Sequence, residues 1–76
     1  MNMQISKKIK SLLAVTDKKQ ADLQGVLGMS SKQSLSNKFT NERWSADDLA
    51  KIAEFCGCKL AFILPSGERI TIEAEE

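Results

Sequence analysis

Two helices are predicted for the first third of the chain. Apolar residues recur every three or four positions over residues 4–15 and again over residues 18–27, as on one face of a helix. We expect Asp17 to cap the second helix and Gly28 to end it, because glycine adopts the left-handed conformation of a helix end without a Cβ clash. The side chains expected to face the core are Ile5, Ile9, Leu12, Leu13, Leu23, Val26 and Leu27.

A third helix is predicted over residues 31–39. Ser30, or Ser31 beside it, is expected to begin this helix, and Gln33 stands at the capping-box distance from Ser30. The two residues expected on its buried side are Leu35 and Phe39.

The fourth helix is predicted over residues 46–56 and has the clearest beginning. Ser45 and Asp48 have the spacing of a capping box, and Trp44 and Leu49 have the spacing of a hydrophobic staple across it. The helix is expected to stop at Gly57, with Leu49, Ile52, Ala53 and Cys56 facing inward.

Beyond residue 58 the apolar pattern changes to alternation. Residues 59–64 and 69–74 are rich in β-branched and aromatic side chains, which predicts two strands forming a hairpin over residues 59–74. The connecting turn suits a type I turn with Pro65 at its second position and Gly67 left-handed. Apolar strand residues that could cover the helices are Leu60, Phe62, Leu64, Ile70 and Ile72.

The predicted fold is one mainly α domain over residues 1–76, with four helices and a C-terminal β-hairpin. A chain of 76 residues has room for only one core. That core is expected to contain Ile9, Leu13, Leu23, Leu27, Leu35, Leu49, Ile52 and Phe62.

The amino-acid composition further limits which class of protein this chain belongs to. The apolar fraction of 42% is typical of globular proteins, and no apolar run approaches the ~20 residues of a membrane span. Residues 1–10 contain no apolar stretch of the signal-peptide kind, so we expect a cytoplasmic protein without membrane contact. Histidine is absent, and Cys56 and Cys58 are too few for structural zinc and too close for an easy disulfide. We expect reduced cysteines, no metal and no cofactor.

Charge is unevenly distributed along the chain. Residues 1–43 carry eight cations and three acids, a net of +5, whereas residues 44–76 carry three cations and seven acids, a net of −4. A basic front and an acidic back are typical of a protein with one half facing phosphates. Chance segregation of solvated charges is the alternative.

The predicted third helix carries a polar outer face without an acid. Two short helices joined by a tight glycine-containing turn form the helix-turn-helix arrangement, whose second helix enters the DNA major groove. Glutamine and asparagine can each pair with adenine, lysine can donate to guanine, and serine can contact either. A solvated helix face without a ligand is the alternative. The residues of this face are Lys32, Gln33, Ser34, Ser36, Asn37 and Lys38.

Several short runs resemble the phage-repressor/Cro (XRE-type) family of helix-turn-helix regulators. They are Gln20-Ala21-Asp22-Leu23, Leu27-Gly28-Met29-Ser30, Leu35, Ser45-Ala46-Asp47-Asp48-Leu49 and Ile52-Ala53, within residues 4–57. The resemblance implies a lambda-repressor-like domain that binds operator DNA, usually as a dimer. It places base contacts on Lys32, Gln33, Ser36 and Asn37. It places phosphate contacts on Lys19 and Gln20, and we add Lys18, Lys38, Asn41 and Arg43.

The chain departs from the family pattern in two places. Gln24 follows Leu23 where the family usually has alanine, and one extra residue separates Gly28 from Leu35. Counting back ten positions from Leu35 reaches Gly25, which is small enough for the close contact that the alanine usually makes. The third helix is therefore expected to be shifted or rotated by part of a turn.

Sequence-specific binding of double-stranded DNA by a repressor-like transcriptional regulator is the predicted function. The chain has no histidine, tyrosine or glycine-rich phosphate loop, so an enzyme is not expected. The alternative is a protein-interaction module, either antitoxin-like or a helix-turn-helix fold that no longer binds DNA. The hairpin is expected to form a homodimer through its outer edge, or else to complete the core of a monomer.

Overall fold

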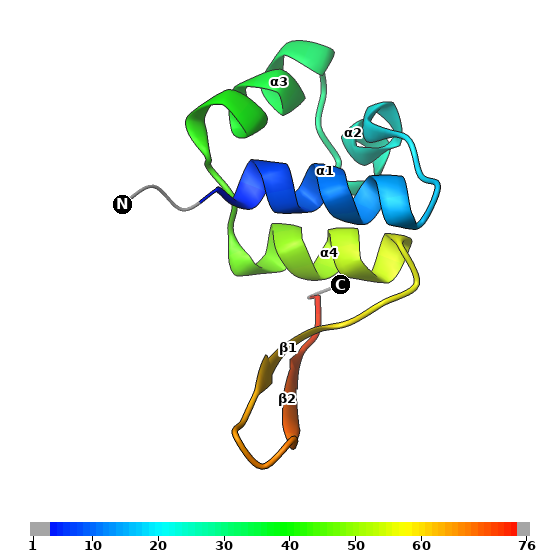
Figure 1. Cartoon of the computed structure of the whole chain (residues 1–76). Coiled ribbons are helices and arrows are strands. Elements are labelled where there is room, and N and C mark those ends of the chain that lie inside the picture. Colours follow the sequence, from blue (N-terminus) through cyan, green and yellow to red (C-terminus); the bar gives the residue numbers. More distant parts are fainter. Residues whose placement is uncertain (1–3, 75–76) are drawn as a thin grey trace.

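A computed structural model describes residues 4–74 of the chain (Figure 1). The described part is mainly helical and ends in a two-stranded antiparallel hairpin, as the sequence predicted. Met1, Asn2, Met3 and the last two acids, Glu75 and Glu76, lie outside the described residues. The elements are α1 (Ile5–Val15), the 3₁₀ turn η1 (Gln20–Asp22), α2 (Leu23–Val26), α3 (Lys32–Asn41), α4 (Ala46–Phe55), β1 (Leu60–Ile63) and β2 (Arg69–Ile72).

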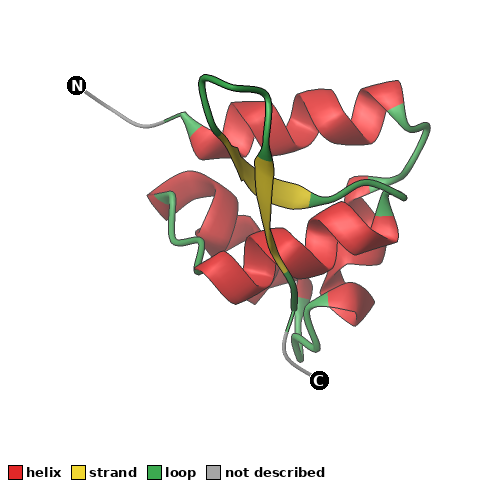
Figure 2. Ribbon diagram, turned by 90° about the horizontal axis from the view of Figure 1, so that it is seen from below, coloured by secondary structure: helices red, strands yellow, loops and turns green. Residues whose placement is uncertain are grey.

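The helices enclose one core, and the hairpin lies outside it. In Figure 1, α1 and α4 cross the middle of the molecule, with α3 on one side of them and the hairpin on the other. Figure 2, seen from below, has the hairpin in front of the helices. Leu23 and Ile52 are the most deeply buried large side chains, at 0% and 1% exposed. The buried core cluster consists of Ile9, Leu13, Leu23, Leu35, Phe39, Ile52 and Cys56.

The beginnings of α3 and α4 are fixed by serine caps. The capping box of α4 is confirmed, because the Ser45 Oγ accepts from the Asp48 N–H at 3.0 Å and Asp48 Oδ2 accepts from the Ser45 N–H at 3.1 Å. At α3 the cap is Ser31, whose Oγ accepts from the Ser34 N–H at 3.2 Å. The capping box expected between Ser30 and Gln33 is therefore wrong, and Ser31 is the correct one of the two candidate serines.

The predicted helix over residues 18–27 is shorter than expected. It begins at Gln20 with one 3₁₀ turn, followed by the four-residue helix α2. Asp17 does not cap it, because its φ of 58° is left-handed and its backbone closes the end of α1. Aspartate tolerates this conformation better than most residues. The backbone at Lys19 is extended and leads into η1. The chain therefore turns back between Asp17 and Gln20, and Lys18 and Lys19 are not helical.

The sequence predicted a structural role for each of two glycines near α2, and one of these predictions is confirmed. Gly28 ends the segment as predicted, with a φ of +65°. Gly25 does not provide the close helix contact that the sequence suggested, because a Cβ added there would meet no atom within 4 Å. Leu23 is the residue of this segment that is fully buried.

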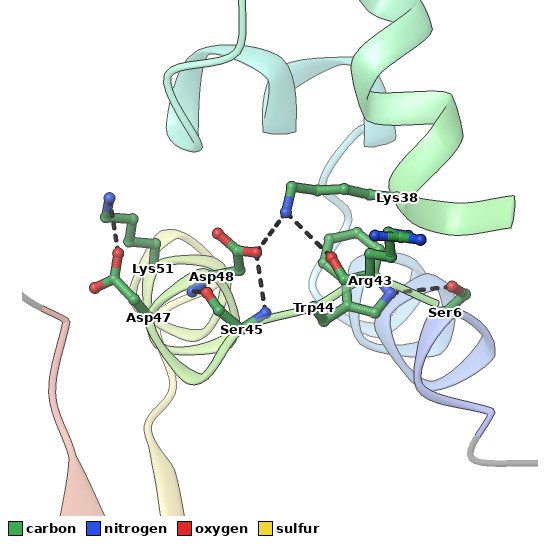
Figure 3. Close-up of polar contacts among 8 residues, drawn as sticks. All are labelled: Ser6, Lys38, Arg43, Trp44, Ser45, Asp47, Asp48 and Lys51. Carbon is green, nitrogen blue, oxygen red and sulfur yellow. Dashed lines mark hydrogen bonds and ion pairs between the residues drawn. The ribbon is translucent and has the colours of Figure 1, made fainter. Parts of the chain in front are cut away.

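Polar contacts fasten α3 to α1 and α4 (Figure 3). The buried Ser6 hydroxyl donates to the Phe39 carbonyl at 2.8 Å and accepts from the Trp44 indole N–H at 3.1 Å. The Trp44 ring in turn packs edge-on against the Phe39 ring, with centroids 4.8 Å apart. The backbone N–H of Ser6 donates to the Glu42 carboxylate at 3.0 Å. These contacts set the position of α3 on the core.

The hairpin has the predicted pairing and turn. Leu60 lies opposite Ile72 and Phe62 opposite Ile70, and the Gly67 N–H donates to the Leu64 carbonyl across the turn. Gly67 has a φ of +93°, as the turn required.

The expectation that Phe62 enters the core is wrong. Its side chain is 65% exposed, and that of Ile70 opposite it is 57% exposed. The hairpin projects away from α4, so that only its base, with Leu60 and Ile72, is half-buried. Of the other predicted core residues, Leu27 and Leu49 are partly buried against the core cluster.

Two further observations concern the chain as a whole. No helix within residues 4–74 is both long enough and apolar enough to cross a membrane. The thiol of Cys58 donates to the Ala53 carbonyl at 3.3 Å, and burial, with the neighbouring Cys56, raises the pKa of this thiol.

Candidate nucleic-acid interface

The outer face of α3 is polar and open to solvent. Leu35 and Phe39 anchor the helix on its inner side, at 5% and 9% exposed. Because a helix has 3.6 residues per turn, residues on the side opposite these two anchors point outward. All four residues predicted to contact bases, Lys32, Gln33, Ser36 and Asn37, are exposed, and the helix contains no acid.

Gln33 and Asn37 are joined on this face. The Gln33 Nε2 donates to the Asn37 Oδ1 at 3.2 Å, one helical turn away. The bond holds both side-chain amides on the same side of α3. It leaves the side-chain oxygen of Gln33 and the side-chain NH₂ group of Asn37 facing solvent. Together the pair still offers the donor and acceptor that pairing with adenine requires.

The predicted phosphate contacts fall into two groups. Five of them are exposed and can meet a ligand: Lys18, Lys19, Gln20, Asn41 and Arg43. Lys38 is different, because its Nζ lies 2.6 Å from Asp48 Oδ2 and 3.1 Å from the Arg43 carbonyl, with the Trp44 ring beneath it (Figure 3). Its side chain is 24% exposed. Lys38 therefore attaches α3 to α4 and is not a free cation.

A basic hollow, unforeseen from the sequence, lies between α1 and η1. It is lined by Lys10, Leu13, Ala14, Lys18 and Gln20. The Lys10 ammonium lies 5.6 Å from the centroid of the Phe39 ring, and the Lys18 ammonium lies 5.3 Å from that of Phe55. Neither lysine forms an ion pair with a carboxylate of residues 4–74. Lysine side chains at such a surface are of the kind that contacts DNA phosphates.

Lys10 is the residue of this hollow that the sequence did not single out. On the helical pattern of α1 it falls on the solvent side, like Lys7 and Lys8. Only the return of the chain after α1, which brings Lys18 and Gln20 beside it, distinguishes Lys10 from these lysines.

The uneven charge along the sequence is also uneven in space. The lysine-bearing helices α1 and α3 lie on one side of α4, and the hairpin lies on the other (Figure 1). The turn η1 itself carries no cation and one acid, Asp22, but Lys18 and Lys19 directly precede it. Two acids of the second half are paired in the first turn of α4, Asp47 with Lys51 and Asp48 with Lys38 of α3. The outer face of α3 carries the exposed Lys32 and no acid.

Comparisons with known proteins leave this interface without a precedent, since no protein-family model, no curated protein and no solved structure matches the chain. Within residues 4–74, no group of three or more histidine, cysteine, aspartate or glutamate residues could hold a metal ion.

Proposed function

We propose that this chain is a sequence-specific double-stranded DNA-binding protein of the helix-turn-helix type. In this proposal η1 with α2 is the first helix of the motif, and α3 enters the major groove. The protein acts in the cytoplasm as a small, non-catalytic, repressor-like regulator of transcription. The resemblance of short sequence runs within residues 4–57 to phage-repressor/Cro proteins supports this assignment.

The observation that carries the proposal is the exposed, acid-free face of α3. Its four outward residues are types that pair with base edges, and Leu35 and Phe39 hold the helix rigidly on the core. Phosphate contacts supply most of the affinity and carry no sequence information, whereas base contacts supply specificity. Lys18, Lys19 and Gln20 on the approach to α2 fit the first role, and Gln33 and Asn37 fit the second.

The departures from the family pattern affect the turn between α2 and α3 more than the two surfaces. Gln24 is half-buried, and its carbonyl accepts from the Met29 N–H at 2.8 Å, which closes the turn. We propose that the extra residue lies between Gly28 and the Ser31 cap. The extra residue changes which residues of α3 lie nearest to a bound duplex. We propose that Lys32 and Gln33, in the first turn, reach the bases first.

Titration of a fluorescent mixed-sequence duplex tests the proposal. We expect micromolar protein to bind at 50 mM salt and to release the duplex as the salt concentration rises, because several phosphate contacts give measurable non-specific affinity. Absence of binding at about 10 µM protein and 50 mM salt would contradict the proposal, since low salt strengthens phosphate contacts well beyond their affinity at physiological salt.

A protein-interaction module is the second candidate, and one observation favours it. The outer half of the hairpin exposes Phe62, Ile63 and Ile70, each more than half exposed, which is unusual for apolar side chains of this size. Such a module would bind a protein through the hairpin and leave the α3 face unused. Failure of the duplex titration would favour this function, whether antitoxin-like or of another kind.

A further inference from the structure

The beginning of α1 and the end of α3 cap each other. The first N–H groups of a helix and its last carbonyls have no partners within the helix. Gln4 provides no side-chain cap for α1, and the backbone N–H of Ser6 instead donates to the carboxylate of Glu42, the residue that ends α3, at 3.0 Å. The Ser6 hydroxyl donates to the Phe39 carbonyl, in the last turn of α3, at 2.8 Å. Two hydrogen bonds from one residue of α1 therefore hold the end of α3.

The Ser6 hydroxyl is buried and both donates and accepts a hydrogen bond. The residue is 6% exposed, and its Oγ accepts from the Trp44 indole N–H at 3.1 Å (Figure 3). The Trp44 ring packs against the Phe39 ring, so the hydroxyl contacts both partners of one aromatic pair. A buried donor or acceptor without a partner is costly. Loss of the hydroxyl therefore favours a shift of Phe39 and Trp44 that brings their polar groups to water.

The polar attachments of α3 are concentrated at its end. Among residues 4–74, the side-chain hydrogen bonds that join α3 and its C-cap to other helices involve Lys38, Phe39 and Glu42. Those of residues 31–37 stay within that range. The first turn of α3 lies six or seven residues before Phe39, which is about 10 Å along a helix. A tilt of about 10° at Phe39 displaces the first turn by about 2 Å, which is enough to break a hydrogen bond to a base edge.

We infer that Ser6 is a positioning residue for base recognition, because it holds the end of α3 at the angle that brings the first turn to the base edges. This inference rests on the proposed DNA-binding function. Ser6 is buried and acts through Phe39 and Trp44. The phosphate contacts proposed at Lys18 and Lys19 belong to a different segment, before η1. Loss of the Ser6 hydroxyl therefore lowers the preference for one DNA sequence more than the affinity for DNA in general.

The ratio of affinities for two duplexes separates positioning from stability. One duplex carries the preferred site, obtained by selecting wild-type-bound DNA from a random pool, and the other has mixed sequence. A loss of folded protein lowers the apparent affinity for both duplexes by the same factor, so their ratio does not depend on stability. We expect Ser6→Ala to lower this ratio by about tenfold and to change the affinity for the mixed duplex by less than about twofold.

Three further variants serve as controls. Ser11→Ala removes an exposed hydroxyl from the same helix and should keep the wild-type ratio. Ile52→Val lowers stability in the core of α4 without removing a hydrogen bond, and should keep the ratio as well. Ser6→Cys retains a weak donor and acceptor and should give an intermediate ratio. Circular dichroism shows which variants are folded, and Ser6→Cys replaces Ser6→Ala in the comparison if the latter is not.

Each outcome of this experiment supports or overturns a distinct claim. A Ser6→Ala protein that keeps the wild-type ratio, or that loses affinity for both duplexes equally, overturns the positioning role and leaves the DNA-binding function intact. A wild-type chain that binds neither duplex, or both equally, overturns the proposed function and the inference with it. Amide spectra without DNA give a second readout: Ser6→Ala should shift the signals of residues 32–34, and shifts confined to the neighbours of Phe39 and Trp44 would overturn the inference.

Discussion

Asp48 combines two roles in one carboxylate. Its Oδ2 accepts from the Ser45 N–H as part of the α4 cap, and the same oxygen lies 2.6 Å from the Lys38 ammonium (Figure 3). Burial by itself raises the pKa of Asp48, but the hydrogen bonds from Lys38 and Ser45 and the positive charge of Lys38 outweigh it and hold the pKa below its ordinary value. The ionised form of Asp48 is therefore stabilised by folding.

This lowered pKa predicts a loss of stability in acid. A group with a depressed pKa in the folded state contributes stability above its unfolded pKa, about 4 for aspartate, and loses it as pH falls through the folded value. Asp48→Asn should lower the free energy of unfolding at pH 7 by about 1 kcal/mol and flatten its pH dependence below about 4. Urea denaturation from pH 2 to pH 7 measures this, with the exposed Asp22→Asn as control. Parallel curves for the wild type and Asp48→Asn would contradict it.

Gln33 and Asn37 are expected to determine the preferred DNA sequence together. Replacing either by alanine should cost about 1–3 kcal/mol of binding to the preferred site and relax its sequence. Because the two amides are hydrogen-bonded to each other, the double variant should lose less than the sum of the single losses. Fluorescence anisotropy with a duplex that contains the preferred site measures the affinity of all three variants. Single variants that weaken every sequence equally would show that this face does not contact bases.

Lys10 and Lys19 are expected to contact DNA phosphates and not bases. Lys10→Gln and Lys19→Gln should each weaken binding to all sequences alike and reduce the dependence of log K on log salt by about one. Lys7→Gln is the matched control, because Lys7 is exposed on α1 but does not border the basic hollow. If Lys7→Gln and Lys10→Gln have the same effect, the hollow is not a phosphate site.

At the scale of elements, the stability of α3 depends on Ser31, the residue that caps its beginning. Ser31→Ala removes the cap and should lower the free energy of unfolding by about 1 kcal/mol. Ser30→Ala is the matched control, since Ser30 is exposed and does not cap the helix, and it should change stability by less than about 0.5 kcal/mol. Urea denaturation at pH 7 compares the two. Equal losses, or a larger loss from Ser30→Ala, would contradict this account of the helix beginning.

The sequence predicted elements best where the signal was local. The α4 cap at Ser45 and the hairpin turn at Gly67 depend on residues within a few positions of each other, and both are confirmed. The second helix was predicted too long, because Asp17 was taken as its cap, whereas Asp17 and the extended Lys19 reverse the chain before η1. The direction of the hairpin was not predictable, because alternation shows that Phe62 shares a face with other apolar residues but not what covers that face.

The sequence predicted which residues lie on the candidate interface better than it predicted how they are arranged. The polar residues of α3 followed from the helical period once Leu35 and Phe39 were taken as its core anchors. The pairing of Lys38 with Asp48 and the approach of Lys18 to Lys10 join different elements. Contacts of this kind depend on how the helices cross, which a period in the sequence does not reveal.

At the scale of the whole molecule, the two proposed surfaces are well separated. α3 and the hairpin lie on opposite sides of α1 and α4, so a duplex bound by α3 would leave the exposed apolar residues of the hairpin uncovered (Figure 1). One helix contacts only a few base pairs, whereas a dimer contacts two half-sites about 34 Å apart. The chain measures 41 × 31 × 23 Å, which is comparable with that spacing.

Backbone amide chemical-shift mapping during titration with a duplex tests the central claim most directly. The account predicts that the shifts concentrate in residues 32–37 of α3 and in residues 18–20, with Lys10 of α1 also affected. The exposed hairpin residues Phe62, Ile63 and Ile70 should change little, because they lie away from α3. Shifts confined to the hairpin, or none with excess duplex at low salt, would contradict DNA binding by the α3 face.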